Sequence, residues 1–406
     1  MAHFVQPKFR KAKLKERMSV ERLRVVSAAV AAAVLVVLMV PVSAVGQAAE
    51  TITLEASKSK VNFGKEIRLT GVASPVTEPQ TVSILDGDST VAEVTTDAAG
   101  KFSLRLTPRR NMKLKAAWSE AVSDQVAVKV RPIVSVKLGA AKLFGKAKVR
   151  GSVKPALSEG RVTVFLLRSG KQVGKRQVFL RKGRWFSAKM KVTKPGGLRA
   201  RALATSSSHR QAVAWSQTRT TSLPSLRSGS SGEYVKLLEK RLINLGYYLP
   251  GADKNFDSRT ADAVLAFNKV QRRARVGTVD ESTWRKLASP IKPKPRYKGP
   301  KFHIEIDQTR QVILTVRKGK VENILHTSTG AGGATRDGTW TVHRVLAGTS
   351  GGGLYYPSYF DGLRAIHGWP EVPTYPASHG CSRVPMWAAT WIFSKAPVGT
   401  RVYVYH

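Results

Sequence analysis

The chain has 406 residues, one cysteine and a formal net charge of +42, with 68 Lys and Arg against 26 Asp and Glu. So long a chain exceeds one hydrophobic core, so three or four domains are expected. The 42% hydrophobic content excludes a disordered basic tail, and a single cysteine excludes an internal disulfide and a cysteine-rich zinc finger. The charge requires a polyanionic neighbour, which charge alone does not identify.

The N-terminal segment indicates export. Residues 1–24 form a basic segment that we expect to stay in the cytoplasm. From 25 to 45 no residue is charged, and at ~1.5 Å per residue this run roughly matches the ~30 Å hydrocarbon core of a bilayer. Residues 25–48 are therefore expected to be a signal peptide or a retained membrane anchor, and the length disfavours a buried core helix. Both expectations place the rest of the chain at the cell wall or the extracellular face of the cytoplasmic membrane, where nucleic acid is a poor partner.

Residues 51–131 and 132–222 are predicted to be two copies of one unit. Three marks recur at offsets of 80 to 83 residues: Phe63-Gly64-Lys65 as Phe144-Gly145-Lys146, Gly71 as Gly151, and Gly100-Lys101-Phe102 as Gly183-Arg184-Trp185. Apolar and polar residues alternate between these marks, which is typical of a β-sandwich. In this pattern the copies resemble bacterial immunoglobulin-like modules.

The second copy carries nearly half of the excess charge. Residues 132–222 hold 21 Lys and Arg against the single acid Glu159, a net charge of +20, whereas residues 51–131 have +3. A run of charge can be only a solvated face, but so much self-repulsion destabilises a compact domain. We therefore expect residues 132–222 to contact anionic wall polymers such as teichoic acid, peptidoglycan carboxylates or the membrane surface.

Residues 226–290 change to a helical period. Val235, Leu238, Leu242 and Leu245 follow one another at steps of 3, 4 and 3, and further helices are expected near 258–270 and around Trp284. Three short helices make a small bundle. The string resembles the bacterial peptidoglycan-binding domain at these positions: Leu226, Gly229, Gly232, Leu238, Gly246, Tyr247, Phe256, Thr260, Phe267, Trp284 and Leu287. The proline-containing segment 291–301 that follows is predicted to be a stiff basic linker, and the alternative is an ordered strap packed on the next domain.

The C-terminal residues 302–406 return to strands, and residues 365–383 carry the chemistry. Ile366-His367-Gly368 is followed, after the nine residues 369–377, by Ser378-His379-Gly380-Cys381-Ser382-Arg383. A thiol with a pKa near ~8.5 needs a base at neutral pH, and an imidazole supplies one. Glycine at 380 allows backbone N–H groups to turn toward an oxyanion. A buried structural cysteine is the plain alternative, and a zinc site would lack a fourth ligand.

These motifs resemble the catalytic domain of L,D-transpeptidases, bacterial cysteine enzymes that cross-link peptidoglycan. The resemblance implies a β-rich catalytic fold, with Cys381 as the acylated nucleophile, His367 as its base, and no metal or cofactor. It also implies that His379, Gly380 and Ser378 shape the pocket around the oxyanion. Further residues are expected at the substrate: Arg383 on a carboxylate, with Tyr356 and Gly368 in the groove. The aromatics around Tyr356 are alternatively ordinary core residues.

The resemblance implies a two-step reaction. Cys381 attacks the third-residue carbonyl of a tetrapeptide stem, and the side-chain amine of another stem then takes the acyl group to form a 3→3 cross-link. An L,D-carboxypeptidase, with water as the acceptor, shares the first step, and a wall-binding scaffold with an inert Cys381 is the remaining alternative. The fold class expected is multidomain and mainly β: two β-sandwich repeats, a three-helix bundle and a β-rich catalytic domain.

Overall fold

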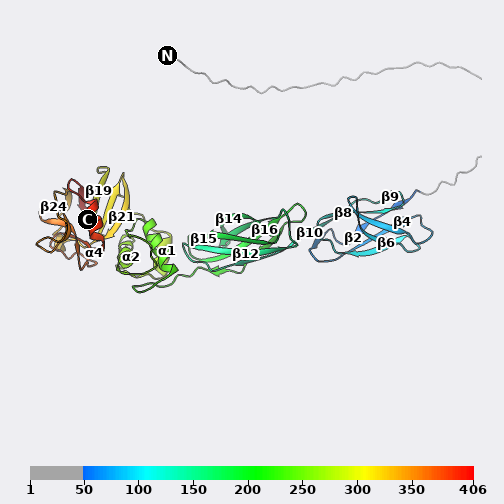
Figure 1. Ribbon diagram of the computed structural model, residues 1–406, viewed down its shortest axis with the longest axis horizontal. Helices are drawn as coiled ribbons and strands as arrows, with labels where there is room; N and C mark the ends of the chain where they lie inside the picture. Colours follow the sequence, from blue (N-terminus) through cyan, green and yellow to red (C-terminus); the bar gives the residue numbers. More distant parts are fainter. Residues whose placement is uncertain (1–48) are drawn as a thin grey trace, which may run out of the picture. The chain divides into compact units, whose positions relative to one another are not determined.

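The computed structural model describes residues 49–406, so the basic segment and the expected signal peptide or anchor lie outside the described residues. Strands dominate the described part, which holds four α-helices (Figure 1). None of these helices combines the length and the apolar character that a membrane span requires. The expectation of a multidomain, mainly β protein is confirmed.

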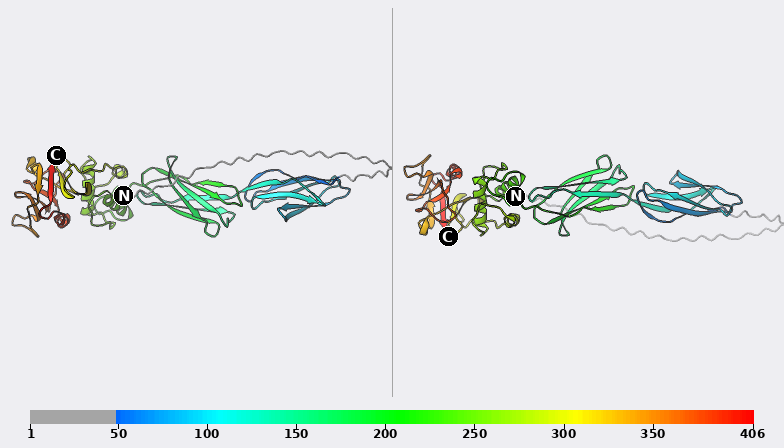
Figure 2. Two further views of the ribbon diagram at one scale, coloured as in Figure 1. Left: turned by 90° about the horizontal axis from the view of Figure 1, so that it is seen from above. Right: turned by 90° about the horizontal axis from the view of Figure 1, so that it is seen from below.

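The first β-module packs two sheets around one core, and its strands gather together in blue and cyan in Figure 2. Its strands are β1 (Thr51–Ile52), β2 (Glu55–Ala56), β3 (Lys60–Asn62), β4 (Ile67–Ser74), β5 (Thr81–Asp86), β6 (Ser89–Thr95), β7 (Lys101–Leu106), β8 (Met112–Trp118), β9 (Ala121–Val122) and β10 (Val126–Arg131). One sheet has the order β1-β4-β2 with β7 beside β4, and the other has the order β3-β10-β8-β5-β6 with β9 beside β8. Leu69, Ile84 and Leu114 are fully buried between them.

The second β-module also has two sheets. Its strands are β11 (Ile133–Leu138), β12 (Lys146–Lys154), β13 (Arg161–Arg168), β14 (Lys171–Phe179), β15 (Trp185–Lys191), β16 (Gly197–Thr205), β17 (Ala212–Trp215) and β18 (Arg219–Thr220). The three-stranded sheet has the order β11-β12-β15, and the larger one has the order β14-β13-β16-β17 with β18 beside β16. In β12 and β15 buried residues alternate with outward ones, as the period of two predicts.

One packing detail recurs in both β-modules and corrects the expected alignment. Gly71 pairs with Phe102, and Gly151 pairs with Phe186. A Cβ on either glycine would lie within 2.3 Å of the phenylalanine ring, so only glycine fits. Phe102 therefore corresponds to Phe186 and not to Trp185, because one more residue separates the phenylalanine from the preceding glycine in the second copy. As a result Trp185 lies on the outer face, 55% exposed.

The helical module contains α1 (Glu233–Asn244), α2 (Ser258–Val270) and α3 (Glu281–Ala288). Asp257 caps α2 by accepting from the N–H of Thr260, and Asp280 forms a capping box with Thr283 at α3. The apolar faces of the three helices enclose a core that includes Leu238, Phe267 and Trp284. The three predicted helices are present.

The C-terminal module has two sheets and one helix. Its elements are β19 (Phe302–Asp307), β20 (Val312–Arg317), β21 (Lys320–His326), the 3₁₀ turn η1 (Ala331–Gly333), β22 (Gly338–Thr341), β23 (Arg344–Val345), β24 (Tyr355–Asp361), β25 (Arg364–Trp369), β26 (Ser382–Pro385), α4 (Met386–Lys395) and β27 (Arg401–Tyr405). The sheets have the orders β21-β20-β19-β27-β22 and β23-β24-β25-β26. Helix α4 packs on β25, where a Cβ on Gly368 would lie 2.6 Å from that of Ala389.

The segment 291–301 packs against the C-terminal module, which differs from the expected stiff linker. Its backbone N–H groups at Arg296 and Tyr297 donate to the carboxylate of Glu305 at 3.0 and 2.9 Å. The Tyr297 ring also stacks on Tyr403 at 4.4 Å. A fully buried carboxylate needs hydrogen-bond donors, and this segment supplies two of them to Glu305.

Candidate active site

The parallel pairing of β25 with β26 joins the two halves of the sequence motif. His367 lies opposite Arg383, and Ile366 lies opposite Ser382. Paired positions share a face of a sheet and successive residues alternate, so Cys381, which immediately precedes β26, lies on the same face as His367. The fold thus brings together two residues that are separated by 14 positions in the chain.

The thiol of Cys381 is held by the backbone. Its Sγ accepts from the N–H of Ala365 at 3.4 Å and lies 3.8 Å from the carbonyl oxygen of Leu363. Burial raises the pKa of Cys381, and the Ala365 hydrogen bond and the charges of Arg383 and Arg364 offset part of that rise. In the part of the chain that the structure describes, no hydrogen bond joins this thiol to a histidine. A protonated thiol at neutral pH needs a base in the reaction itself.

His367 has the protonation state of a base. Its ring is 1% exposed, and Nδ1 lies 2.9 Å from the carbonyl oxygen of Gly368. Because a carbonyl only accepts, Nδ1 carries the hydrogen and Nε2 keeps its lone pair. Burial lowers the pKa of His367, and the charge of Arg383 lowers it further. The imidazole is therefore neutral at pH 7.

The turn before Cys381 is built by Ser378 and Gly380. The hydroxyl of Ser378 donates to the carbonyl of Cys381 at 2.6 Å and accepts from the N–H of Gly380 at 3.1 Å. Gly380 has φ +133, and a Cβ there would lie 2.8 Å from Nε of Arg364. Thr335 donates to the Gly380 carbonyl at 2.8 Å. The Ser378 hydroxyl is thus engaged within the turn that it shapes.

The other four residues predicted to belong to the site differ in their exposure and contacts. His379 is exposed and Arg383 lies over the Trp369 ring at 5.0 Å. Tyr356 has φ +48 and packs edge-on against Phe393 of α4. Gly368 is buried beneath α4, so its lack of a side chain serves helix packing and it does not face an open groove.

The sequence interpretation missed an ion-pair cluster beside the turn. The buried carboxylate of Asp361 accepts from Nε of Arg336 at 3.0 Å and from Arg364 at 3.2 Å. Arg364 also donates from Nε to the carbonyl of Ala334 at 2.7 Å. The cluster therefore ties the segment before β22 to the end of β24. The i,i+3 spacing of Asp361 and Arg364 was the only part of this cluster visible in the sequence.

A cavity of about 410 Å³ lies beside Leu363, and Cys381 is not among the residues that line it. Its lining includes Leu363, whose carbonyl contacts Sγ of Cys381, and Leu354 and Tyr359, which flank the expected groove residue Tyr356 in the sequence. Arg344 lies over the Tyr359 ring at 4.0 Å and adds a positive charge to the cavity wall. The cavity therefore suits a ligand with both apolar and anionic groups.

Hydrogen bonds from the helical module and from β21 hold residues 372–374, which precede the turn at Ser378. His326 in β21 donates from Nε2 to the carbonyl of Val372 at 2.9 Å, and Lys269 of α2 donates to Nδ1 of the same ring. Arg275 donates to the carbonyl of Thr374 at 2.6 Å. Both carbonyls belong to the chain that enters Ser378. The position of the cysteine turn thus depends on two modules.

Two parts of the chain match models of known protein families. Residues 301–404 match the model of the L,D-transpeptidase catalytic domain, and residues 231–287 match that of a peptidoglycan binding domain. The L,D-transpeptidase from Xylanimonas cellulosilytica DSM 15894 is 33% identical to the chain, with 47% of this chain and all of that one covered and a TM-score of 0.43. L,D-transpeptidase 1 of Mycobacterium tuberculosis is 18% identical, with 25% of this chain and 60% of that one covered and a TM-score of 0.23.

A curated relative covers a smaller part. The N-acetylmuramoyl-L-alanine amidase CwlL of Bacillus licheniformis is 40% identical over 80 residues, which are 19% of this chain. The chain spans only 22% of that relative's length. The two matches show that the chain carries an L,D-transpeptidase catalytic domain with a peptidoglycan binding domain ahead of it.

Proposed function

We propose that this enzyme forms 3→3 cross-links between peptidoglycan stems through a thioester on Cys381. The observation that carries the proposal is the pairing of β25 with β26, which presents a neutral His367 on the same face as the thiol. The peptidoglycan binding domain supports action on the assembled polymer. Both wall-directed domains favour a location outside the cytoplasm, at the cell wall.

In the first step Sγ of Cys381 attacks the carbonyl carbon of the third stem residue while Nε2 of His367 takes the thiol proton. The C–N bond to the terminal D-alanine then breaks, and the imidazolium gives its proton to the leaving amine. The products are free D-alanine and a thioester. In the described residues the N–H groups of His379 and Cys381 make no hydrogen bond, so they can hold the oxyanion, whereas that of Gly380 is engaged by Ser378.

In the second step the side-chain amine of another stem attacks the thioester carbonyl. His367 takes a proton from this amine, the C–S bond breaks, and the proton passes to the departing thiolate. The guanidinium of Arg383, which is fixed over Trp369, is suited to a stem carboxylate. Water in place of the amine would give an L,D-carboxypeptidase, because the first step is the same.

The test is mass spectrometry of muropeptides after the full chain is incubated with purified sacculi. The expected products are 3→3 dimers together with free D-alanine, and both should be lost in Cys381→Ala. D-Alanine release with tripeptide stems and no dimers would identify a carboxypeptidase. Unchanged muropeptides with the wild-type chain would favour a scaffold role.

A further inference from the structure

The outer face of the three-stranded sheet in the second β-module carries positive charge and no negative charge. The register places cations directly opposite one another across the strands: Lys137 and Arg150, Lys148 and Lys189, and Lys146 and Lys191. All six are exposed, and the sequences of β11, β12 and β15 contain no Asp or Glu. Like charges opposite one another destabilise a sheet, so this face costs the fold stability.

These six cations are left without partners, unlike three arginines of the other sheet in the module. On the larger sheet, Arg161 lies over Phe179, Arg201 over Phe165 and Arg199 over Trp215, at 4.3 to 5.4 Å. Within residues 49–406, no ion pair or aromatic ring engages any of the six on the three-stranded sheet. The three-stranded sheet therefore presents six cations that no acidic or aromatic side chain of the described residues engages.

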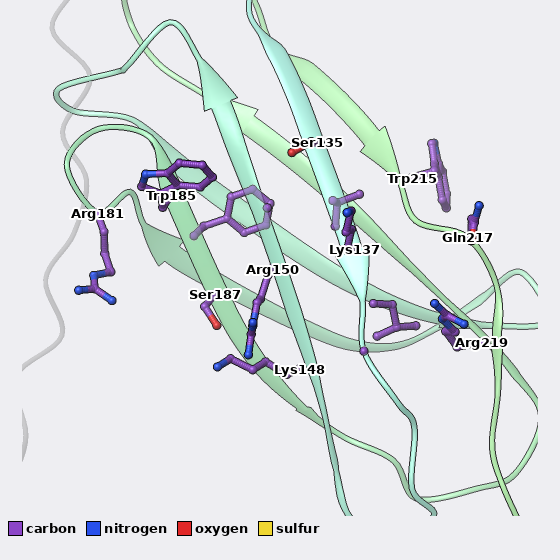
Figure 3. A pocket seen from close by; sticks show the side chains of 15 residues that line it. Ser135, Lys137, Lys148, Arg150, Arg181, Trp185, Ser187, Trp215, Gln217 and Arg219 are labelled. Carbon is purple, nitrogen blue, oxygen red and sulfur yellow. The ribbon is translucent and has the colours of Figure 1, made fainter.

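The charged face is also hollowed into a groove of about 1210 Å³ (Figure 3). Figure 3 shows Trp185 on one side of this groove and Trp215 on the other, with Lys137 and Arg150 between them. The two indole side chains are 55% and 44% exposed. Exposed aromatic surface at the rim of a charged groove is a mark of a binding site.

We propose that this groove binds a phosphodiester-linked glycopolymer of the cell wall. Phosphate groups recur along such a polymer, as the cations do along the strands, and Arg150 can fork onto a phosphate while the lysines act as point charges. The flat apolar face of Trp185 suits the C–H face of a sugar ring. A groove with aromatic walls fits a chain better than it fits a flat lipid surface. The site would add a second wall contact, which raises the effective concentration of the active site at the polymer.

The test measures binding of the full chain to fluorescent poly(ribitol phosphate), with and without sugar substituents, by anisotropy. The groove variant is Lys137→Gln, Lys148→Gln and Arg150→Gln. The control variant makes the same charge change elsewhere in the module, as Arg161→Gln, Lys171→Gln and Lys194→Gln. The groove variant should weaken binding roughly tenfold or more, and the control variant less than about threefold. Binding by the wild type should also weaken as salt rises.

Trp185→Ala separates sugar recognition from charge. It should weaken binding to the sugar-bearing polymer about tenfold and leave binding to the bare polymer almost unchanged. Equal losses in the groove and control variants would overturn the proposal, because charge alone would then explain the binding. So would an unchanged affinity of Trp185→Ala for the sugar-bearing polymer, or tighter binding to phosphatidylglycerol vesicles or to single-stranded DNA than to that polymer. In the described structure the substituted side chains other than that of Arg161 make no hydrogen bond, ion pair or ring contact. Circular dichroism melting checks that each variant folds.

Discussion

Nζ of Lys269 in α2 lies 2.6 Å from Nδ1 of His326 in β21, at the contact between the helical and catalytic modules. The same Nζ donates to the carbonyl oxygens of Gln311 and Thr327, each at 3.0 Å. Nε2 of His326 faces the carbonyl of Val372, so it carries the hydrogen and Nδ1 accepts. Three acceptors surround Nζ, and burial lowers the pKa of Lys269. A fully hydrogen-bonded amine thus joins the two modules.

Removing the amine of Lys269 should lower the stability of the chain and speed hydrogen exchange near the contact between the two modules. Lys269→Met leaves Nδ1 of His326 and the carbonyl of Thr327 without the donor that Lys269 supplies, whereas the carbonyl of Gln311 keeps the N–H of Thr327. It should lower the free energy of unfolding by about 3 kcal/mol in urea titrations. Lys240→Met, on the exposed face of α1, is the control and should change it by less than about 0.5 kcal/mol. Hydrogen exchange should also become faster in residues 370–377, which His326 anchors. Equal stabilities of the two variants would contradict the structural role of Lys269.

Acid should weaken the same contact. Burial, and then the charge of Lys269, lower the pKa of His326 from 6.5 to about 3. The unfolded chain therefore binds more protons between these values, so stability rises with pH across this window and is lost as pH falls through it. From pH 7 to pH 5 the loss from His326 should be roughly 2 kcal/mol.

Two neighbouring groups also titrate, so the effect of His326 is measured as the difference between the wild type and a His326 variant. Burial raises the pKa of Asp262 to about 6, so the contribution of Asp262 to stability rises as pH falls between ~6 and ~4, opposite to that of His326. Lys269 makes stability depend on pH only above pH ~6. His326→Asn keeps an acceptor for Lys269 but does not titrate. Its unfolding free energy should fall less between pH 7 and pH 5 than that of the wild type. Parallel pH profiles would show that His326 is not the titrating group.

Some of this site was predictable from local pattern, and the rest was not. The 3-4-3 spacing around Leu238 predicts α1 because helix periodicity depends only on near neighbours. The motif around Cys381 was equally local. The contact between Lys269 and His326 joins residues 57 positions apart, and the binding of Tyr297 to Glu305 depends on where a carboxylate is buried. Trp185 points outward because the turn before it has one extra residue. Side chains alternate between the two faces of a strand, so one added residue moves each following side chain to the opposite face.

The assignment of His367 as the base is tested by comparing two histidines. His367→Ala should slow the release of D-alanine by roughly 10²–10⁴-fold, the usual contribution of a positioned base. His379→Ala, which removes an exposed ring with no hydrogen bond in the described structure, should slow it less than about threefold. If His379→Ala is the slower variant at saturating substrate, the base has been assigned wrongly.

The protonation state of the thiol can be followed by alkylation. Because burial raises the pKa of Cys381, the rate of reaction with iodoacetamide should rise with pH to a midpoint above ~8.5, the value of a free thiol. The same chain unfolded in urea is the control, with a midpoint near ~8.5. A folded-state midpoint below pH 7 would mean that the resting site holds a thiolate beside an imidazolium.

The ion-pair cluster beside the turn should support catalysis without taking part in it. Asp361→Asn removes the buried charge that Arg336 and Arg364 share, and should lower the free energy of unfolding by about 2 kcal/mol. Because Arg364 lies against Gly380, kcat should fall while the pH dependence of kcat stays that of the wild type. Glu322→Gln, which breaks the exposed pair with Arg317, is the control and should change stability by less than about 1 kcal/mol. A shifted pH profile in Asp361→Asn would show that Asp361 acts on the protons of the reaction and not only on the position of the turn.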